Sequence, residues 1–244
     1  MKNQNSLEYC KKCELEISGN YCISCGNAKE LRRIDGRYIA KEVSGVLNFD
    51  KGILYTIREL LIRPGAAVRR FIAEDRNRLV KPVIFILISS LIYSVLRGFF
   101  HFEDGYIKYD DSNFTTATVI FKWLQNNYGY GNLIMGVFIA FWTKLLFKKY
   151  GYNFYEILIL LCFVMGIGMI ILAAFGTIQG LTSLKVLDYG GMLFIVYSCW
   201  AIGQFFDKKR VANYFKALFS YILGLITFMI AVLLIGYLID LVIK

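Results

Sequence analysis

Long apolar runs alternate with short polar segments along most of this chain. A helix needs about 20 apolar residues to cross the ~30 Å hydrocarbon core of a bilayer, and five runs approach that length. We predict five membrane-spanning helices, with four or six as the alternatives. They lie at residues 82–102, 131–147, 156–178, 190–206 and 217–239. The predicted fold class is therefore an all-α integral membrane protein with its transmembrane bundle at residues 81–244.

Residues 47–80 precede the first span, and we call them the collar. Their pattern predicts two short amphipathic helices, which meet at Arg63-Pro64-Gly65. Basic residues flank both apolar stripes and form the predicted membrane-surface site: Lys51, Arg58, Arg63, Arg69, Arg70, Arg76 and Arg78. An apolar stripe with a basic flank suits a helix that lies on anionic lipid headgroups. It equally suits a helix that packs against the inner end of the bundle, and the sequence leaves both alternatives open.

The overall composition agrees with a membrane protein. Hydrophobic residues make up 57% of the chain and charged residues 19%, with a mean hydropathy of +0.51. Soluble domains average about 45–50% apolar and 25% charged residues, and a soluble fold of this length has no interior for the excess. The net charge of +10 does not indicate a nucleic-acid partner, because basic residues also collect beside membrane spans.

The charges are distributed unequally between the two sides of the predicted spans. Residues 1–81 carry 16 basic and 10 acidic side chains. With the loops assigned in turn, the side of the N-terminus has a net charge of +11 and the opposite side −2. Because basic loops resist translocation, we expect the N-terminus in the cytoplasm and the C-terminus outside it.

Four of the six cysteines form two CxxC pairs, Cys10 with Cys13 and Cys22 with Cys25. Two such pairs close a tetrahedral site with no open position, which is the pattern of structural zinc. We therefore predict a zinc ribbon at residues 1–28, followed by a linker at 29–46. The alternatives are disulfides, which are disfavoured in the cytoplasm, and unrelated free thiols. An iron–sulfur or redox site is a weaker one.

The sequence offers little for catalysis. His101 is the one histidine, and no Ser-His-Asp arrangement, HExxH or P-loop is present. No carboxylate falls in the middle of a span, which also weakens an ion-coupled transporter. Arg97 is the one charge well inside a span and forms a candidate intramembrane polar site, with Glu103 and Asp104 as candidate partners. We expect the protein not to be an enzyme, and a lipid-modifying enzyme has the weakest support.

Glycines recur in the third and fifth predicted spans, at Gly166, Gly168, Gly176, Gly224 and Gly236. Small residues allow helices to approach closely, so packing within the bundle or between protomers is the simpler explanation. The alternative is that Gly166-Ile167-Gly168 marks a flexible break that lines a pathway.

Three motifs follow the cysteine pairs in order along the chain. They are Asn48-Phe49-Asp50-Lys51-Gly52, Leu60-Leu61-Ile62-Arg63-Pro64-Gly65 and Lys81-Pro82. With the ribbon they resemble a family of bacterial membrane proteins defined by domain of unknown function 3667. The resemblance covers residues 10 to about 100 and implies a multi-span protein of the bacterial inner membrane with no established activity.

Two functional hypotheses remain. In the first, this is a binding or regulatory protein whose ribbon recruits a cytoplasmic protein partner while the collar contacts anionic headgroups of the bilayer. In the second, it is a small oligomeric channel or permeability effector, for instance a membrane accessory of a bacterial defence system. Homo-oligomers fit either hypothesis.

Overall fold

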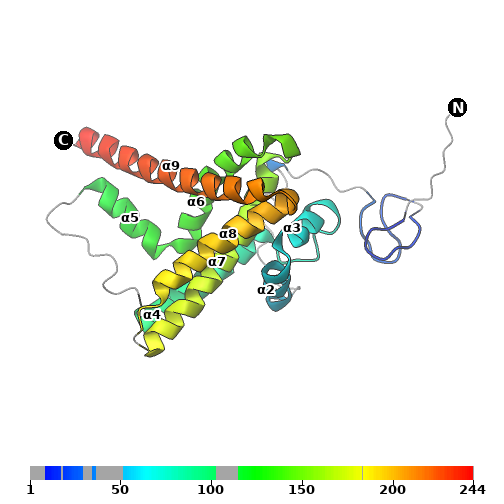
Figure 1. Cartoon of the computed structure of the whole chain (residues 1–244), viewed down its shortest axis with the longest axis horizontal. Coiled ribbons are helices and arrows are strands. Elements are labelled where there is room, and N and C mark those ends of the chain that lie inside the picture. The colour runs from blue at the N-terminus through cyan, green and yellow to red at the C-terminus, as the bar shows by residue number, and fades with distance from the viewer. Residues whose placement is uncertain are drawn as a thin grey trace.

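The computed structural model describes residues 9–17, 19–29, 35–36, 52–102, 115–182 and 184–243. Within these ranges five helices are long and apolar enough to cross a membrane. They are α4 (Pro82–Phe100), α6 (Tyr128–Leu146), α7 (Phe154–Thr182), α8 (Leu187–Asp207) and α9 (Val211–Ile243) (Figure 1). The prediction of five spans is thus confirmed. The described residues form an all-helical, multi-pass membrane protein with a cysteine cluster near its N-terminus.

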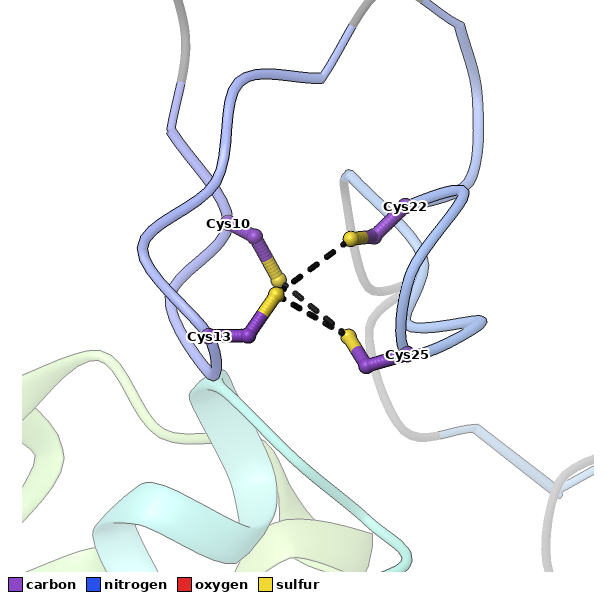
Figure 2. A group of neighbouring side chains, drawn as sticks. All are labelled: Cys10, Cys13, Cys22 and Cys25. Atoms are coloured by element: carbon purple, nitrogen blue, oxygen red, sulfur yellow. Dashed lines mark hydrogen bonds between the residues drawn. The ribbon is translucent and has the colours of Figure 1, made fainter.

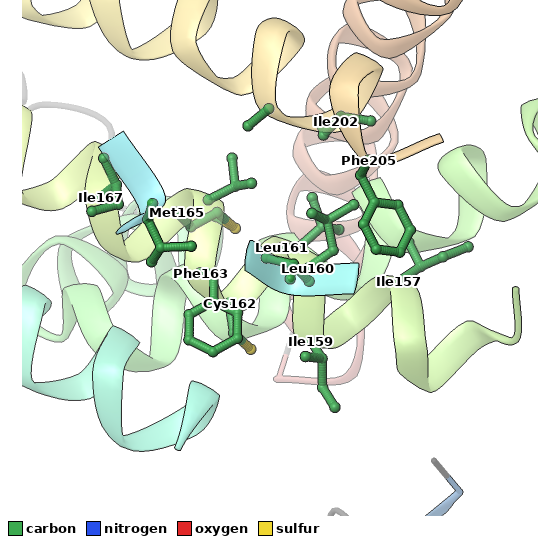
Figure 3. Packing of buried hydrophobic residues seen from close by; sticks show 14 of the residues in the cluster. Ile157, Ile159, Leu160, Leu161, Cys162, Phe163, Met165, Ile167, Ile202 and Phe205 are labelled. Carbon is green, nitrogen blue, oxygen red and sulfur yellow. The ribbon is translucent and has the colours of Figure 1, made fainter. Parts of the chain in front are cut away.

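Helix α7 forms the centre of the bundle. It is apolar on all sides, as a helix surrounded by other helices requires, and it contacts α4, α6 and α8. The ring of Phe163 on α7 lies 5.4 Å from that of Phe71 and 5.8 Å from that of Phe85. Its neighbours Leu160 and Leu161 are fully buried in the same core (Figure 3). Helix α9 is different, because most of its large side chains are exposed to the surroundings of the bundle.

The glycines of α7 receive aromatic rings from neighbouring helices. A Cβ atom on Gly166 would lie 2.6 Å from the ring of Phe85, and one on Gly168 would overlap the ring of Phe194. Helix α7 continues unbroken through both glycines, which are buried. The alternative of a flexible break at this point is therefore wrong, and packing within the bundle explains these residues.

The N-terminus of α7 is fixed by a reciprocal pair of hydrogen bonds. The backbone N–H of Asn153 donates to Glu156 Oε2 at 2.7 Å, and the N–H of Glu156 donates to Asn153 Oδ1 at 2.8 Å. Each side chain thereby satisfies an amide that the first helical turn leaves without an intrahelical acceptor. The helix therefore begins at Phe154, slightly before the predicted start of the span.

The segment between the first two spans contains a helix that the sequence pattern does not predict. Helix α5 (Thr116–Asn126) packs against α9. A Cβ on Gly236 of α9 would lie 2.7 Å from the Cα of Ala117, so this glycine allows the close approach of the two helices. Residues 103–114 lie outside the described residues, and Glu103 and Asp104 are among them.

The collar forms the two predicted helices, α2 (Ile53–Ile62) and α3 (Pro64–Ala73). Val68 and Phe71 of α3 are fully buried and belong to the main core of the bundle. Gly65 lies against the end of α8, where an added Cβ would be 2.5 Å from the backbone nitrogen of Phe205. For α3, packing against the bundle is therefore the correct alternative. The short helix η1 (Lys148–Tyr150) joins α6 to α7.

Candidate metal centre

The four predicted ligands come together at one point of the ribbon. The Sγ atoms of Cys10 and Cys25 are 3.5 Å apart, those of Cys13 and Cys22 are 3.4 Å apart, and all four lie within 4.8 Å of one another (Figure 2). Four sulfurs bound tetrahedrally at ~2.3 Å from an ion would be about 3.8 Å apart. The cluster therefore has the size and the donor set of a closed metal site.

The two halves of the ribbon are built alike. In the first half the N–H of Cys10 donates to the carbonyl of Leu15 at 2.8 Å, and the N–H of Glu14 donates to the carbonyl of Cys10 at 2.8 Å. The second half repeats both bonds around Cys22. The residue after each CxxC has positive φ, +59° at Glu14 and +68° at Gly26. Glycine accepts this conformation freely, whereas the Cβ of glutamate makes it costly.

Backbone amides favour thiolates in the cluster. The pKa of Cys10 is lowered to about 6, chiefly by the backbone N–H of Cys13, and the N–H of Cys25 is the largest cause of the lowered pKa of Cys22. The N–H of Leu15 also lowers the pKa of Cys13, yet the nearby Cys22 thiol and burial raise it overall to about 12. Thiolates this close repel one another, so a bound cation is needed to ionise all four.

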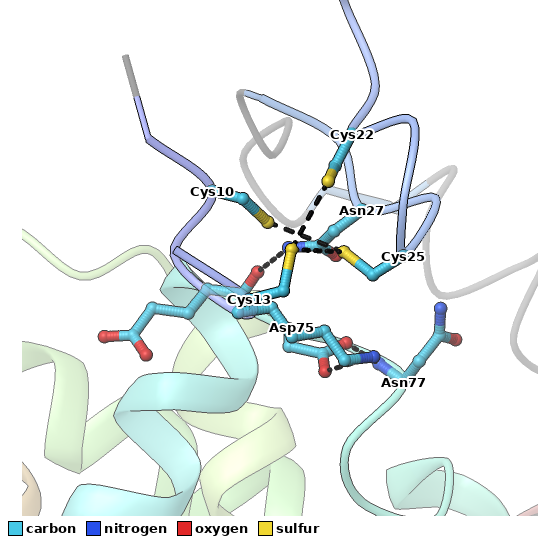
Figure 4. A network of polar contacts seen from close by, with 9 residues as sticks. Cys10, Cys13, Cys22, Cys25, Asn27, Asp75 and Asn77 are labelled. Atoms are coloured by element: carbon cyan, nitrogen blue, oxygen red, sulfur yellow. Dashed lines mark hydrogen bonds and ion pairs between the residues drawn. The ribbon is translucent and has the colours of Figure 1, made fainter. Parts of the chain in front are cut away.

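The ribbon rests on the turn between α3 and α4, at residues 74–77. Lys12 Nζ lies 3.2 Å from the carboxylate of Asp75, and Asn27 Nδ2 donates to the carbonyl of Glu74 at 3.1 Å. Figure 4 shows Asn27 of the ribbon beside the turn that carries Asp75 and Asn77. Asp75 is only 7% exposed, and its Oδ1 also accepts the backbone N–H of Asn77 at 2.9 Å. The sequence alone does not predict this contact, because its partners lie far apart in the chain.

One predicted membrane-surface arginine points into the protein. Arg69 Nη1 donates to the carbonyl of Phe205 at 2.7 Å and also to that of Gln204. These carbonyls belong to the last turn of α8, where a cation is favoured by the helix dipole and by acceptors without an intrahelical donor. Arg69 therefore joins α3 to α8.

The other predicted surface residues differ in their surroundings. Arg58, Arg63 and Arg78 are exposed, and the guanidinium groups of Arg63 and Arg78 lie 3.8 Å and 4.0 Å from the buried carboxylate of Glu59. Arg70 and Arg76 are half-buried, and Lys51 lies outside the described residues.

Helix α2 leaves a second apolar face uncovered. Leu60 is buried against the bundle, but Leu54 is 78% exposed, and Leu61 and Ile62 are exposed as well. Arg58 lies on the same side of the helix, one turn from Leu54. The predicted apolar stripe is therefore divided between a face in the core and an exposed face.

Arg97 binds the end of a helix. Its guanidinium donates to the carbonyl of Gln125 at 2.9 Å and to Asn126 Oδ1 at 3.4 Å, and it lies 5.3 Å from the ring centre of Tyr128. Gln125 and Asn126 form the C-terminus of α5, so the cation lies at the negative end of that helix dipole.

The opposite end of α5 is bound by a carboxylate. The backbone N–H of Thr116 donates to the two oxygens of Asp240 at 3.1 Å and 3.2 Å, and the Thr116 hydroxyl also contacts this carboxylate. Two spans thus hold α5 by charges that match its dipole. The sequence alone predicts no role for Asp240, because nothing near it along the chain indicates its partner.

Residues 50–94 match the family model described as "Protein of unknown function (DUF3667)". The matched segment comprises α2, α3 and most of α4, and it does not include the ribbon. Neither a curated protein nor a solved structure matches the chain.

Proposed function

We propose that this chain is a zinc-binding, regulatory protein of a bacterial inner membrane, in which the ribbon recruits a cytoplasmic protein partner. Zinc is the metal that best fits four thiolates in a closed site, because structural Zn²⁺ is almost always tetrahedral and takes cysteine thiolates as ligands. The basic bias of residues 1–81 supports a cytoplasmic location for the ribbon and the collar.

The observation that carries the proposal is the apolar surface of the ribbon. Its core consists of Cys10, Ile17 and Cys22, with Cys13 and Cys25 against them. Among residues 9–17 and 19–28, four large apolar side chains are exposed outside this core: Tyr9, Leu15, Tyr21 and Ile23, the last 87% exposed. Large apolar side chains concentrated on so small a unit favour a protein-binding role. Tyrosine in particular is enriched in the buried centre of protein interfaces.

Crosslinking in native membranes, followed by affinity purification, tests the proposal. Ile23→Ser removes an apolar contact while leaving the four cysteines in place, so we expect zinc content to stay unchanged and the crosslinked partner to be lost. Lys11→Ser is the matched control, since Lys11 occupies the same position of the other CxxC pair and is also exposed. The proposal fails if the wild-type ribbon and the Ile23→Ser and Cys13→Ala/Cys25→Ala variants all capture the same proteins.

The collar supplies the proposed contact with lipid. The exposed face of α2 combines Leu54, Leu61 and Ile62 with Arg58, which suits a helix partly inserted among anionic headgroups. Vesicle flotation of the purified protein does not isolate this contact, because the spans insert anyway. The contact can be measured with a fluorescent probe at position 54 and lipids that carry a quencher at a known depth. We expect quenching at headgroup depth, and an aqueous signal would contradict the lipid contact.

We keep the small oligomeric channel as the second hypothesis, although aromatic side chains of the same chain occupy the space beside Gly166 and Gly168. It stays a separate hypothesis for an oligomer. Ion flux through liposomes that contain the purified protein would favour it over partner recruitment.

A further inference from the structure

Both halves of the ribbon take part in its contact with the membrane bundle. Lys12 belongs to the first CxxC loop, and Asn27 follows the second. Lys12 pairs with Asp75, and Asn27 binds the Glu74 carbonyl, so the two acceptors are neighbours on one turn. The two contacts form together only when the halves of the ribbon hold a fixed relative orientation.

The cysteine cluster is what fixes that orientation. The buried side chains of the ribbon are too few to stabilise it alone, since domains below about 40 residues generally need a metal or disulfides. The closest sulfur pairs join the two halves, Cys10 to Cys25 and Cys13 to Cys22. A metal ion held by these sulfurs would therefore connect the halves directly.

The docking residues are also part of the thiol environment. Lys12 directly precedes Cys13, and the carbonyl of Asn27 accepts the backbone N–H of Cys22 at 2.7 Å. The positions of Lys12 and Asn27 thus depend on where the sulfurs are held. Their side chains then reach the 74–77 turn, whose Asp75 carboxylate is otherwise buried.

We propose that metal binding controls the docking of the ribbon on the turn between α3 and α4. With metal bound, the ribbon is held at the collar, and without metal it is released. The inference rests on the metal site of the proposed function and not on partner recruitment. Because linkage is reciprocal, docking must raise the affinity of the ribbon for metal by the same factor as metal strengthens docking.

A zero-length crosslink measures docking directly. In the full-length protein in lipid nanodiscs, a carbodiimide joins the Lys12 amine to the Asp75 carboxylate as an amide, and mass spectrometry quantifies the linked peptides. We expect the crosslink with zinc bound, at least a tenfold loss after chelation, and recovery when zinc is returned. Lys12→Arg is the control, because it keeps the charge but gives no amide. A crosslink yield that is independent of zinc would overturn the proposal.

A second measurement separates docking from folding of the ribbon. Asp75→Asn keeps the oxygen that accepts the Asn77 N–H and removes the charge that faces Lys12. We expect its zinc affinity to fall about fivefold, the upper range for a partly exposed ion pair, with one zinc still bound. Glu74→Gln is the matched control and should bind zinc normally, because Glu74 contacts Asn27 through its carbonyl. Equal zinc affinities for Asp75→Asn and the wild type would contradict the coupling.

The two proposals can fail separately. A zinc-dependent crosslink without any partner that depends on Ile23 would leave gated docking and remove recruitment. A zinc-independent crosslink with a partner that depends on Ile23 would do the reverse.

Discussion

Replacing Gly65 by alanine tests the packing of the collar on the bundle. Gly65 lies in the first turn of α3, against the last residues of α8. An added Cβ would lie 2.5 Å from the nitrogen of Phe205 and 2.6 Å from the carbonyl oxygen of Gln204. These are backbone atoms of a packed helix, so no side-chain rotation relieves the overlap. The two helices must instead separate by about 1 Å to restore van der Waals distance.

That separation has two energetic consequences. Overpacking in a well-packed core costs about 1–3 kcal/mol. It also stretches the bonds from Arg69 to the Gln204 and Phe205 carbonyls, and a hydrogen bond from a charged group contributes about 1.5–3 kcal/mol. The higher helix propensity of alanine returns less than about 1 kcal/mol. We therefore expect Gly65→Ala to lower the free energy of unfolding by about 2–3 kcal/mol.

Equilibrium unfolding in mixed micelles measures this loss. Tryptophan fluorescence is a suitable signal, because Trp200 of α8 packs against the main core. Gly98→Ala is the matched control: Gly98 is in α4, and a Cβ there would have no atom within 4 Å. We expect the control to match the wild type or exceed it slightly. If the free energy of unfolding of Gly65→Ala also lies within about 0.5 kcal/mol of the wild-type value, the close contact does not have the energetic cost argued above.

Four further predictions concern α5 and the ribbon. Arg97→Ala should weaken the packing of α5 on the spans by about 1–2 kcal/mol, because the charge-assisted bonds at the C-terminus of α5 are lost. Faster amide exchange across residues 116–126 would reveal this loss. Asp240→Asn keeps an acceptor for the Thr116 amide, so the same assay should give a smaller loss, about 0.5–1 kcal/mol. Glu14→Gly should stabilise the metal-bound ribbon by about 0.5–1 kcal/mol, because it removes a Cβ from a residue in the left-handed conformation. The variant should therefore bind zinc more tightly, which competition with a zinc chelator would detect. Chelation of the metal should unfold the ribbon and leave the far-ultraviolet dichroism of the helices nearly unchanged; a large loss of helix would contradict the independence of the bundle.

The two faces of helix α2 show what a periodic sequence pattern cannot predict. The sequence indicates an apolar stripe, and the structure has one, but Leu60 lies in the core while Leu54 is exposed. Helical spacing gives the angle of each side chain around its own helix. It does not give the position of the neighbouring helices, so it cannot distinguish a face that packs on protein from one that meets lipid.

Helix α5 was missed for a different reason. Its segment is short and mixed in polarity, and each of its ends is bound by a residue from another span. Asp240 is 124 residues from Thr116, and Arg97 is 28 residues from Gln125. Local propensity alone leaves a helix of this length marginal, and most of its stability comes from tertiary contacts.

The sequence by itself determined the five spans, the two collar helices and the four candidate metal ligands. These features depend on local properties, namely the apolar length that crosses a bilayer, the helical period, and the spacing that brings two thiols to one ion. Only the tertiary structure decided that Arg69 binds the end of α8, that the glycines of α7 accept aromatic rings, and that the ribbon rests on Asp75. Each of these depends on which distant residues become neighbours, and that is set by the packing of the whole bundle around α7.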